Sequence, residues 1–135
     1  MTGSKLIDHC RRLDDATLTR QLTAIFRVEK VVLAEQLARL IAFDERDLSQ
    51  KHAYPSLFKY CVGVLGLSED AASFRITAAR AASRYPNILD QLKSGTLTLT
   101  GAAKLAPHLN NDNAQSLLAK SEGKTTFEIK LLVAE

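Results

Sequence analysis

The sequence has few aromatic residues, and this shortage bears on its fold class. Phe, Trp and Tyr together make up 6% of the 135 residues, and Trp is absent. Leu and Ala are frequent instead, and because they are good helix formers the composition favours packed helices over a β-sandwich. Hydrophobic residues make up 46% of the chain, which suits a folded core and argues against disorder.

Cysteine is scarce as well. The chain has two Cys, Cys10 and Cys61, and neither belongs to a Cys-x-x-Cys pair. Two distant cysteines do not make a disulfide framework, so we expect a reducing, cytoplasmic location. Cys61 lies among apolar residues, and we expect it to be a small core residue rather than a nucleophile.

Long apolar runs are absent too. No stretch approaches the roughly 18 consecutive apolar residues that a membrane span requires. The N-terminus also lacks the apolar segment of a signal peptide. We therefore expect no membrane partner.

The net charge of +3 is too small to indicate nucleic-acid binding by itself, but its distribution is uneven. Residues 1–55 contain nine Lys/Arg and eight Asp/Glu, whereas residues 56–104 contain six and three. Residues 105–135 contain three and four. The positive excess thus falls on the middle segment, although a solvated helix face often carries as much.

The longest predicted helix spans residues 16–42, which contain neither Gly nor Pro. Apolar side chains recur there at steps of three and four residues, as on one face of a helix. The stripe is wide, so we expect it to pack against more than one neighbour. Glu29 and Gln36 interrupt the stripe, which disfavours a strict heptad but leaves open a dimeric coiled coil through this helix.

Start and stop signals divide the chain into further, shorter helices. The predicted starts are Ser4, Asp14 or Asp15, Pro55 or Ser56, Ser68, Asn87, Thr98 or Thr100, and Thr125 or Thr126. The alternation in residues 96–100 is interpreted as a loop, because Gly95 and Gly101 bracket it. The sequence therefore predicts an all-α, compact domain of about eight helices, in which residues 1–53 and 54–135 pack as one domain.

Two of the predicted helices form a helix-turn-helix-like pair. The first ends at Leu65, and Gly66 supplies the turn because glycine reaches positive φ at no steric cost. The second opens at Ser68 and runs to about Tyr85, before Pro86. Small all-helical domains present a helix to DNA in this way.

The second helix of the pair has an apolar face and a polar, basic face. Ser73 and Thr77 lie four residues apart on one face, with Arg80 one turn further, and such side chains reach base edges or phosphates. We predict that this helix docks on duplex DNA. The predicted DNA-binding residues are Ser68, Ser73, Arg75, Thr77, Arg80, Arg84, Lys93 and Lys104.

An ordinary helical hairpin with solvated arginines fits the same pattern. Glu69 and Asp70 favour that interpretation, because at the groove-entering end they would meet phosphates with the wrong sign. The arrangement of the arginines separates the two hypotheses. The DNA-binding hypothesis is favoured if the arginines share one exposed face, and it is disfavoured if they pair with acidic residues of the first two helices.

An ordered set of motifs runs through residues 54–133. The motifs are YPSLFKYC at 54–61, LGLSEDAA at 65–72, LKSGTLTL at 92–99 and LAPHL at 105–109. This order resembles the helical region ahead of the nuclease module in bacterial HNH-endonuclease-like proteins. The middle part is similar to the helix-turn-helix region of ParB-type partition proteins. Both resemblances imply DNA contact by the helix that follows Ser68.

The chain also departs from these families. The nuclease of the resembled group needs clustered His and Asn residues, whereas His9, His52 and His108 are scattered here. We therefore expect no enzyme activity, no catalytic residue, no metal and no cofactor in this chain. Val62 and Ala72 depart as well, because a helix-turn-helix usually has Ala at the first position and a branched apolar residue at the second.

The alternative is a protein-interaction or dimerisation domain without DNA contact. In that hypothesis the helix over residues 16–42 pairs with a partner or with its own copy. A homodimer is also compatible with DNA binding, since paired helix-turn-helix units commonly contact two half-sites.

Overall fold

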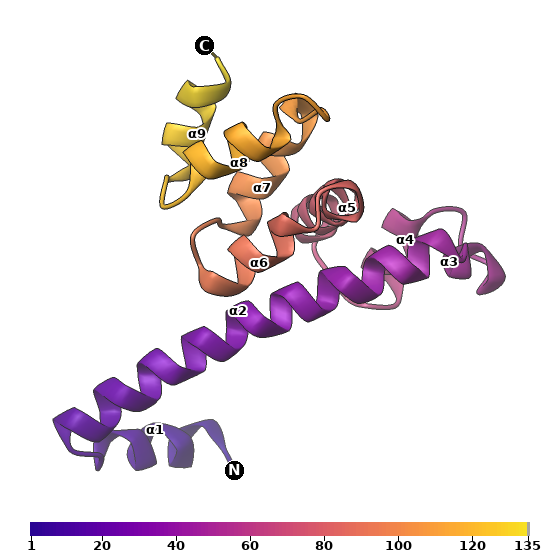
Figure 1. Ribbon diagram of the computed structural model, residues 1–135. Helices are drawn as coiled ribbons and strands as arrows, with labels where there is room; N and C mark the ends of the chain where they lie inside the picture. Colours follow the sequence, from indigo (N-terminus) through magenta and orange to yellow (C-terminus); the bar gives the residue numbers. More distant parts are fainter. Residues whose placement is uncertain (135) are drawn as a thin grey trace.

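The structure is a computed structural model that describes residues 1–134, and these residues form helices and no strand (Figure 1). The elements are α1 (Gly3–Arg11), α2 (Asp15–Glu45), α3 (Leu48–Lys51), α4 (Leu57–Gly63), α5 (Glu69–Arg84), α6 (Asn87–Ser94), α7 (Leu99–Leu105), the 3₁₀ turn η1 (Ala106–His108), α8 (Ala114–Ser121) and α9 (Thr126–Val133). The predicted all-α class is confirmed, with nine α-helices in the described range. None of them combines the length and the apolarity that crossing a bilayer requires.

The C-terminal half of α2 is the base of the core. Its buried residues are Ala34, Leu37 and Leu40, and this half packs against α5 and α6. Leu37 is fully buried. The remaining helices stack above this base, with α7 on α5 and α9 on α7 (Figure 1).

Helix α5 lies at the centre of the packing. It contacts α2, α4, α6 and α7, and its buried face is built almost entirely of alanine. Alanine carries no side chain beyond Cβ, so neighbouring helices can approach α5 closely. The buried residues of α5 are Ala72, Ile76, Ala78, Ala79, Ala81 and Ala82.

Most of the predicted helix starts are confirmed. In each case a side-chain oxygen accepts a hydrogen bond from the backbone N–H three residues on, which satisfies a donor that the first turn leaves free. The confirmed caps are Asp14, Ser56, Ser68, Thr98 and Thr125. Residues 96–98 form a loop that leads into the Thr98 cap, as predicted, whereas Leu99 and Thr100 already belong to α7.

Two predicted caps are wrong. Helix α1 begins at Gly3, because the Thr2 hydroxyl, not Ser4, accepts the bond from the Lys5 N–H at 3.2 Å. Asn87 is the first residue of α6 and not its cap, because its amide donates to Gln91 Oε1 at 3.3 Å.

Two glycines act as the sequence predicts. Gly66 in the α4–α5 turn has φ +72° and Gly95 at the end of α6 has φ +85°, a region that L side chains rarely adopt. At Gly95 the space is also filled, because a Cβ there would lie 2.8 Å from Lys30 Nζ. The missing Cβ leaves room for the Lys30 side chain of α2 beside the end of α6.

Three sets of apolar side chains stay exposed. The stripe of α2 packs against more than one neighbour, as predicted, because α5 and α6 both cover its C-terminal half, whereas its N-terminal half is exposed. Leu65 is 49% exposed beside the Gly66 turn. In α9, Phe127 and Leu131 face outward and Ile129 alone is fully buried, because α7 covers one side of that short helix.

We predict that Leu37→Ala lowers the free energy of unfolding by about 2–5 kcal/mol, because it leaves a cavity beneath α5 and α6. Urea unfolding followed by circular dichroism measures this loss. The matched control is Leu131→Ala, since Leu131 is 55% exposed and its truncation should change stability by less than about 0.5 kcal/mol. Equal losses in the two variants would contradict the packing described here.

Candidate nucleic-acid interface

One face of α5 stays open to solvent while the rest of the helix is packed. Ser73, Arg80 and Arg84 are exposed and Thr77 is half-buried. These four positions are separated by four, three and four residues, so they align along one side of the helix. We call this row the α5 face. Because the other sides of α5 are fixed in the core, the α5 face is held rigidly.

Arg80 on the α5 face is paired with an acidic residue of α2. Its Nε donates to Asp44 Oδ2 at 3.0 Å and its Nη2 donates to Asp44 Oδ1 at 3.4 Å. The hydrogen bond that Arg80 donates to Asp44 raises the pKa of Arg80 above its ordinary value. The Arg80 side chain remains 61% exposed, so the guanidinium is reachable but its charge is largely balanced.

Arg75 lies on a different side of α5. Its Nε donates to Gln36 Oε1 of α2 at 3.3 Å, and its Nη1 donates to the Ala71 carbonyl at 3.2 Å. Arg75 and Arg39 line a cavity of about 390 Å³ beside the α4–α5 turn. The structure therefore does not bring Arg75 to the α5 face.

Arg84 of the α5 face and Lys104 of α7 each lie over an aromatic ring. The Arg84 guanidinium is 5.3 Å from the centroid of the Tyr85 ring. Lys104 of α7 places its Nζ 5.8 Å from the ring centroid of Phe74, a residue of α5. Such cation–π contacts leave the charges in solvent while limiting where they move.

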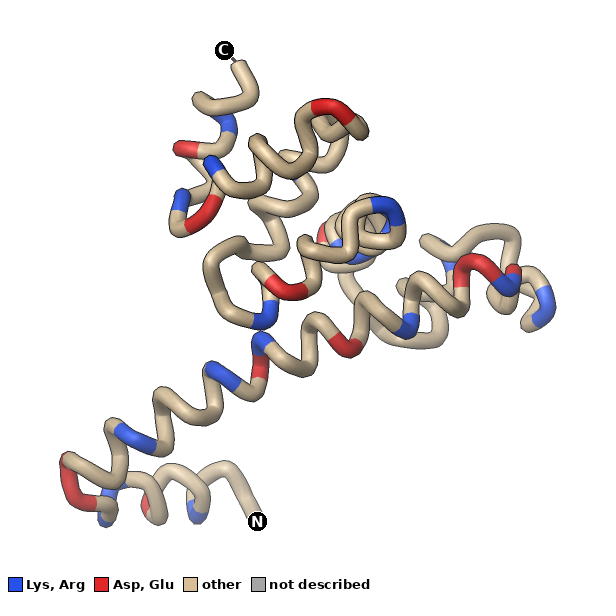
Figure 2. The backbone as a smooth tube through the Cα atoms, viewed as in Figure 1, with Lys and Arg blue, Asp and Glu red and all other residues tan. Residues whose placement is uncertain are grey.

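The other predicted residues are arranged less favourably. The Ser68 hydroxyl caps α5 by accepting from the Ala71 N–H at 3.1 Å. Lys93 is exposed in the last turn of α6, and no contact joins it to the α5 face. Glu69 and Asp70 are exposed in the first turn of α5, so this end of the helix is acidic. In Figure 2, charged residues of either sign are few and widely spaced on the helices above α2.

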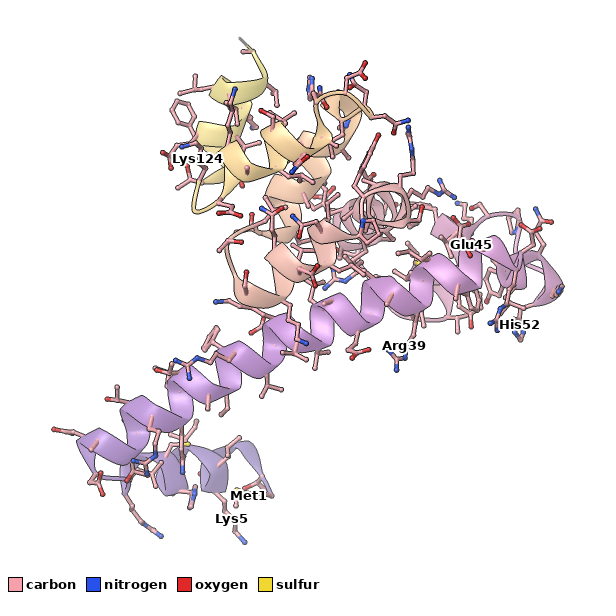
Figure 3. The ribbon with its side chains drawn as sticks, in the orientation of Figure 1. Met1, Lys5, Arg39, Glu45, His52 and Lys124 are labelled. Atoms are coloured by element: carbon pink, nitrogen blue, oxygen red, sulfur yellow. The ribbon has the colours of Figure 1, made fainter. Side chains whose placement is uncertain are left out.

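Asp44 and Gln36 were missed by the sequence analysis. They are 36 and 39 residues from the arginines that they contact, and no local spacing signals such a pair. An aromatic cluster near α3 was also missed: Phe43 packs on Tyr60 with centroids 4.7 Å apart, and His52 lies parallel to Phe43 at 6.4 Å. Figure 3 shows His52 at the end of the molecule where α2 and α3 meet.

Metal-ligating side chains and the cysteines were the remaining candidates for chemistry in the described chain. Residues 1–134 contain no cluster of three or more His, Cys, Asp or Glu side chains that could hold a metal ion. Cys61 is fully buried, as predicted. Burial raises the pKa of the Cys61 thiol, and a protonated, inaccessible thiol is a poor nucleophile.

We predict that Cys61 is unreactive in the folded protein. In a Cys10→Ser background, Ellman's reagent should label no thiol at pH 8 until denaturant is added. Adding Val64→Cys supplies a matched control, because Val64 follows α4 and is 49% exposed, so its thiol should react at once. Rapid labelling of Cys61 without denaturant would place it outside the core.

Comparison with known proteins gives no relative. No protein-family model, no curated protein and no solved structure matches the chain. The resemblances to HNH-endonuclease-like and ParB-type proteins therefore stay predictions.

Proposed function

We propose that the chain is a non-catalytic DNA-binding module that docks the α5 face on duplex DNA. The observation that supports this proposal is that α5 is buried on its other sides and presents one aligned polar and basic row. A rigid helix that offers such a row fits the major groove. The resemblance to the front of HNH-endonuclease-like proteins implies the same contact.

In this proposal the residues have different roles. Ser73 and Thr77 form the N-terminal half of the α5 face and contact base edges. Arg84 and Lys104 supply the charge for phosphates, because neither forms an ion pair in the described structure. Arg75 and Lys93 do not belong to the docking face.

Asp44 limits the affinity in this proposal. Its carboxylate balances Arg80 and adds negative charge close to where a phosphate would lie. Docking therefore requires Arg80 to turn from Asp44 to the phosphate, or to bind while shared between them. In both cases Asp44 weakens the attraction between Arg80 and the phosphate.

The second candidate is a protein-interaction domain without DNA contact. It is favoured by the contacts of Arg80 with Asp44 and of Arg75 with Gln36, which direct two of the three arginines toward α2. Under this hypothesis the α5 face is only solvated. Titration with duplex DNA distinguishes the two candidates.

We expect the full chain to bind a mixed-sequence duplex with affinity that falls linearly in log–log coordinates as salt rises. The slope should be about −0.9 for each phosphate neutralised. Fluorescence anisotropy between roughly 50 and 200 mM salt measures the slope. Absence of binding at roughly 50 mM salt would contradict the proposal and favour the second candidate.

Removing a phosphate contact should weaken binding without changing the fold. Arg84→Ala and Lys104→Ala should each reduce the magnitude of the salt slope by about 1. Lys120→Ala is the matched control, because Lys120 is an exposed cation on α8 that lines a different cavity, with Asn113 and Leu132, from the one that Arg84 lines. If Lys120→Ala changes the slope as much as the other two, the α5 face is not the docking surface.

Asp44→Asn should have the opposite effect. Removing the carboxylate frees the Arg80 guanidinium, so duplex affinity should rise several-fold and the salt slope should become steeper by about 1. Arg80→Ala should abolish this gain in the double variant. An Asp44→Asn protein with unchanged or weaker binding, but normal helicity, would show that Arg80 does not meet phosphate.

A further inference from the structure

The N-terminal part of the chain projects from the helical core. We call residues 1–33 the arm, which consists of α1 and the first half of α2 (Figure 1). Helix α1 has no buried residue, and the first buried residue of α2 is Ala34. Only Cys10, Leu13, Thr17 and Leu33 of the arm are even half-buried.

The arm nonetheless carries most of the exposed apolar surface. Ten of the fourteen large apolar side chains that are exposed along residues 1–134 lie on it. They are Met1, Leu6, Ile7, Leu18, Leu22, Ile25, Phe26, Val28, Val31 and Val32. Ile25, in the middle of the arm, is 64% exposed. Figure 3 shows the side chains of the arm extending into open space, with Met1 and Lys5 at the free end of α1.

The arm's apolar side chains form a stripe rather than a scatter. Leu18, Leu22 and Ile25 follow one another at steps of four and three residues, and Val32 continues the row seven residues later. This is the spacing of a helix face that packs on another helix. Glu29 lies within the row, and its charge restricts the alignments in which a partner helix can pack there.

The accessible surface area of the whole chain shows how much surface the fold leaves uncovered. The chain exposes 8953 Å², whereas a compact monomer of its 14.8 kDa mass is expected to expose roughly 7000 Å². The excess is roughly 2000 Å². A stable interface covers about 800 Å² on each partner, and obligate homodimers cover roughly 1000 Å² or more. The excess is therefore enough for a dimer interface of the obligate class.

Charge along the arm favours a second copy as the occupant. Its six Lys/Arg and four Asp/Glu are mixed, so no strong field of one sign selects an oppositely charged partner. The start of α2 is acidic at Asp14 and Asp15, whereas residues 27–30 carry a net positive charge. In an antiparallel pair of arms that cross near Leu22, the acidic segment of each copy lies beside the positive segment of the other copy. The two-fold axis makes these two contacts equivalent.

We infer that the arm is a dimerisation element that packs antiparallel against the arm of a second copy of this chain. The paired α1 and α2 segments then form a four-helix unit, in which the row from Leu18 to Ile25 is covered by the same row of the other copy. This inference does not depend on DNA binding by the α5 face. In such a dimer each copy keeps its own α5 face, since α5 lies outside the arm.

Sedimentation equilibrium of the full chain without DNA tests the inference. We expect twice the chain mass at micromolar concentration. Leu22→Glu with Ile25→Glu should weaken the dimer about 100-fold or more, because it places four carboxylates in an apolar interface. Phe127→Glu with Leu131→Glu is the matched control, since both residues are exposed on α9, and it should leave the dimer unchanged. A monomer at 100-fold higher concentration would overturn the inference.

Disulfide trapping tests the orientation. In a Cys10→Ser background, Leu22→Cys should yield a covalent dimer on oxidation, because the two copies of residue 22 meet at the axis. Asp15→Cys should yield none, because in an antiparallel pair the two copies of residue 15 lie far apart. Efficient cross-linking of Asp15→Cys would overturn the antiparallel arrangement.

Discussion

The packing of α5 on the second half of α2 is the contact on which the rest of the structure depends. Leu37 and Leu40 form the lower side of that contact, and the alanine-rich face of α5 forms the upper side. Because alanine has no bulk beyond Cβ, α4, α6 and α7 also reach α5. The helix that presents the candidate DNA-binding face is therefore the best-fixed helix of the chain. Any substitution that enlarges one of these alanines would separate the helices around it.

The same contact explains why the two halves of α2 differ. The second half is covered by α5 and α6, whereas most of the first half extends beyond them, with α1 alongside its start. One continuous amphipathic pattern thus serves two purposes along a single helix. The part nearest the core stabilises the fold, and the remainder offers an apolar surface to a second copy in our proposal.

Local signals in the sequence were enough to predict the helices but not the contacts between them. Asp14, Ser56, Ser68, Thr98 and Thr125 act within one helical turn, so their caps were predictable from short motifs. The exposure of Ile25 and the burial of Leu37 were not predictable, because both residues belong to the same apolar stripe. The spacing of Ser73, Thr77, Arg80 and Arg84 was predictable for the same local reason. The partners Asp44 and Gln36 depend on how α2 crosses α5, which no short motif encodes.

The central claim is that the α5 face meets DNA. The most direct measurement is a map of backbone amide chemical shifts during titration of the labelled chain with a duplex. The account predicts shifts concentrated at Ser73, Thr77, Arg80, Arg84 and Lys104, with α9 unaffected. Shifts confined to the arm, or no shifts at a low salt concentration at which the duplex is in excess, would contradict it.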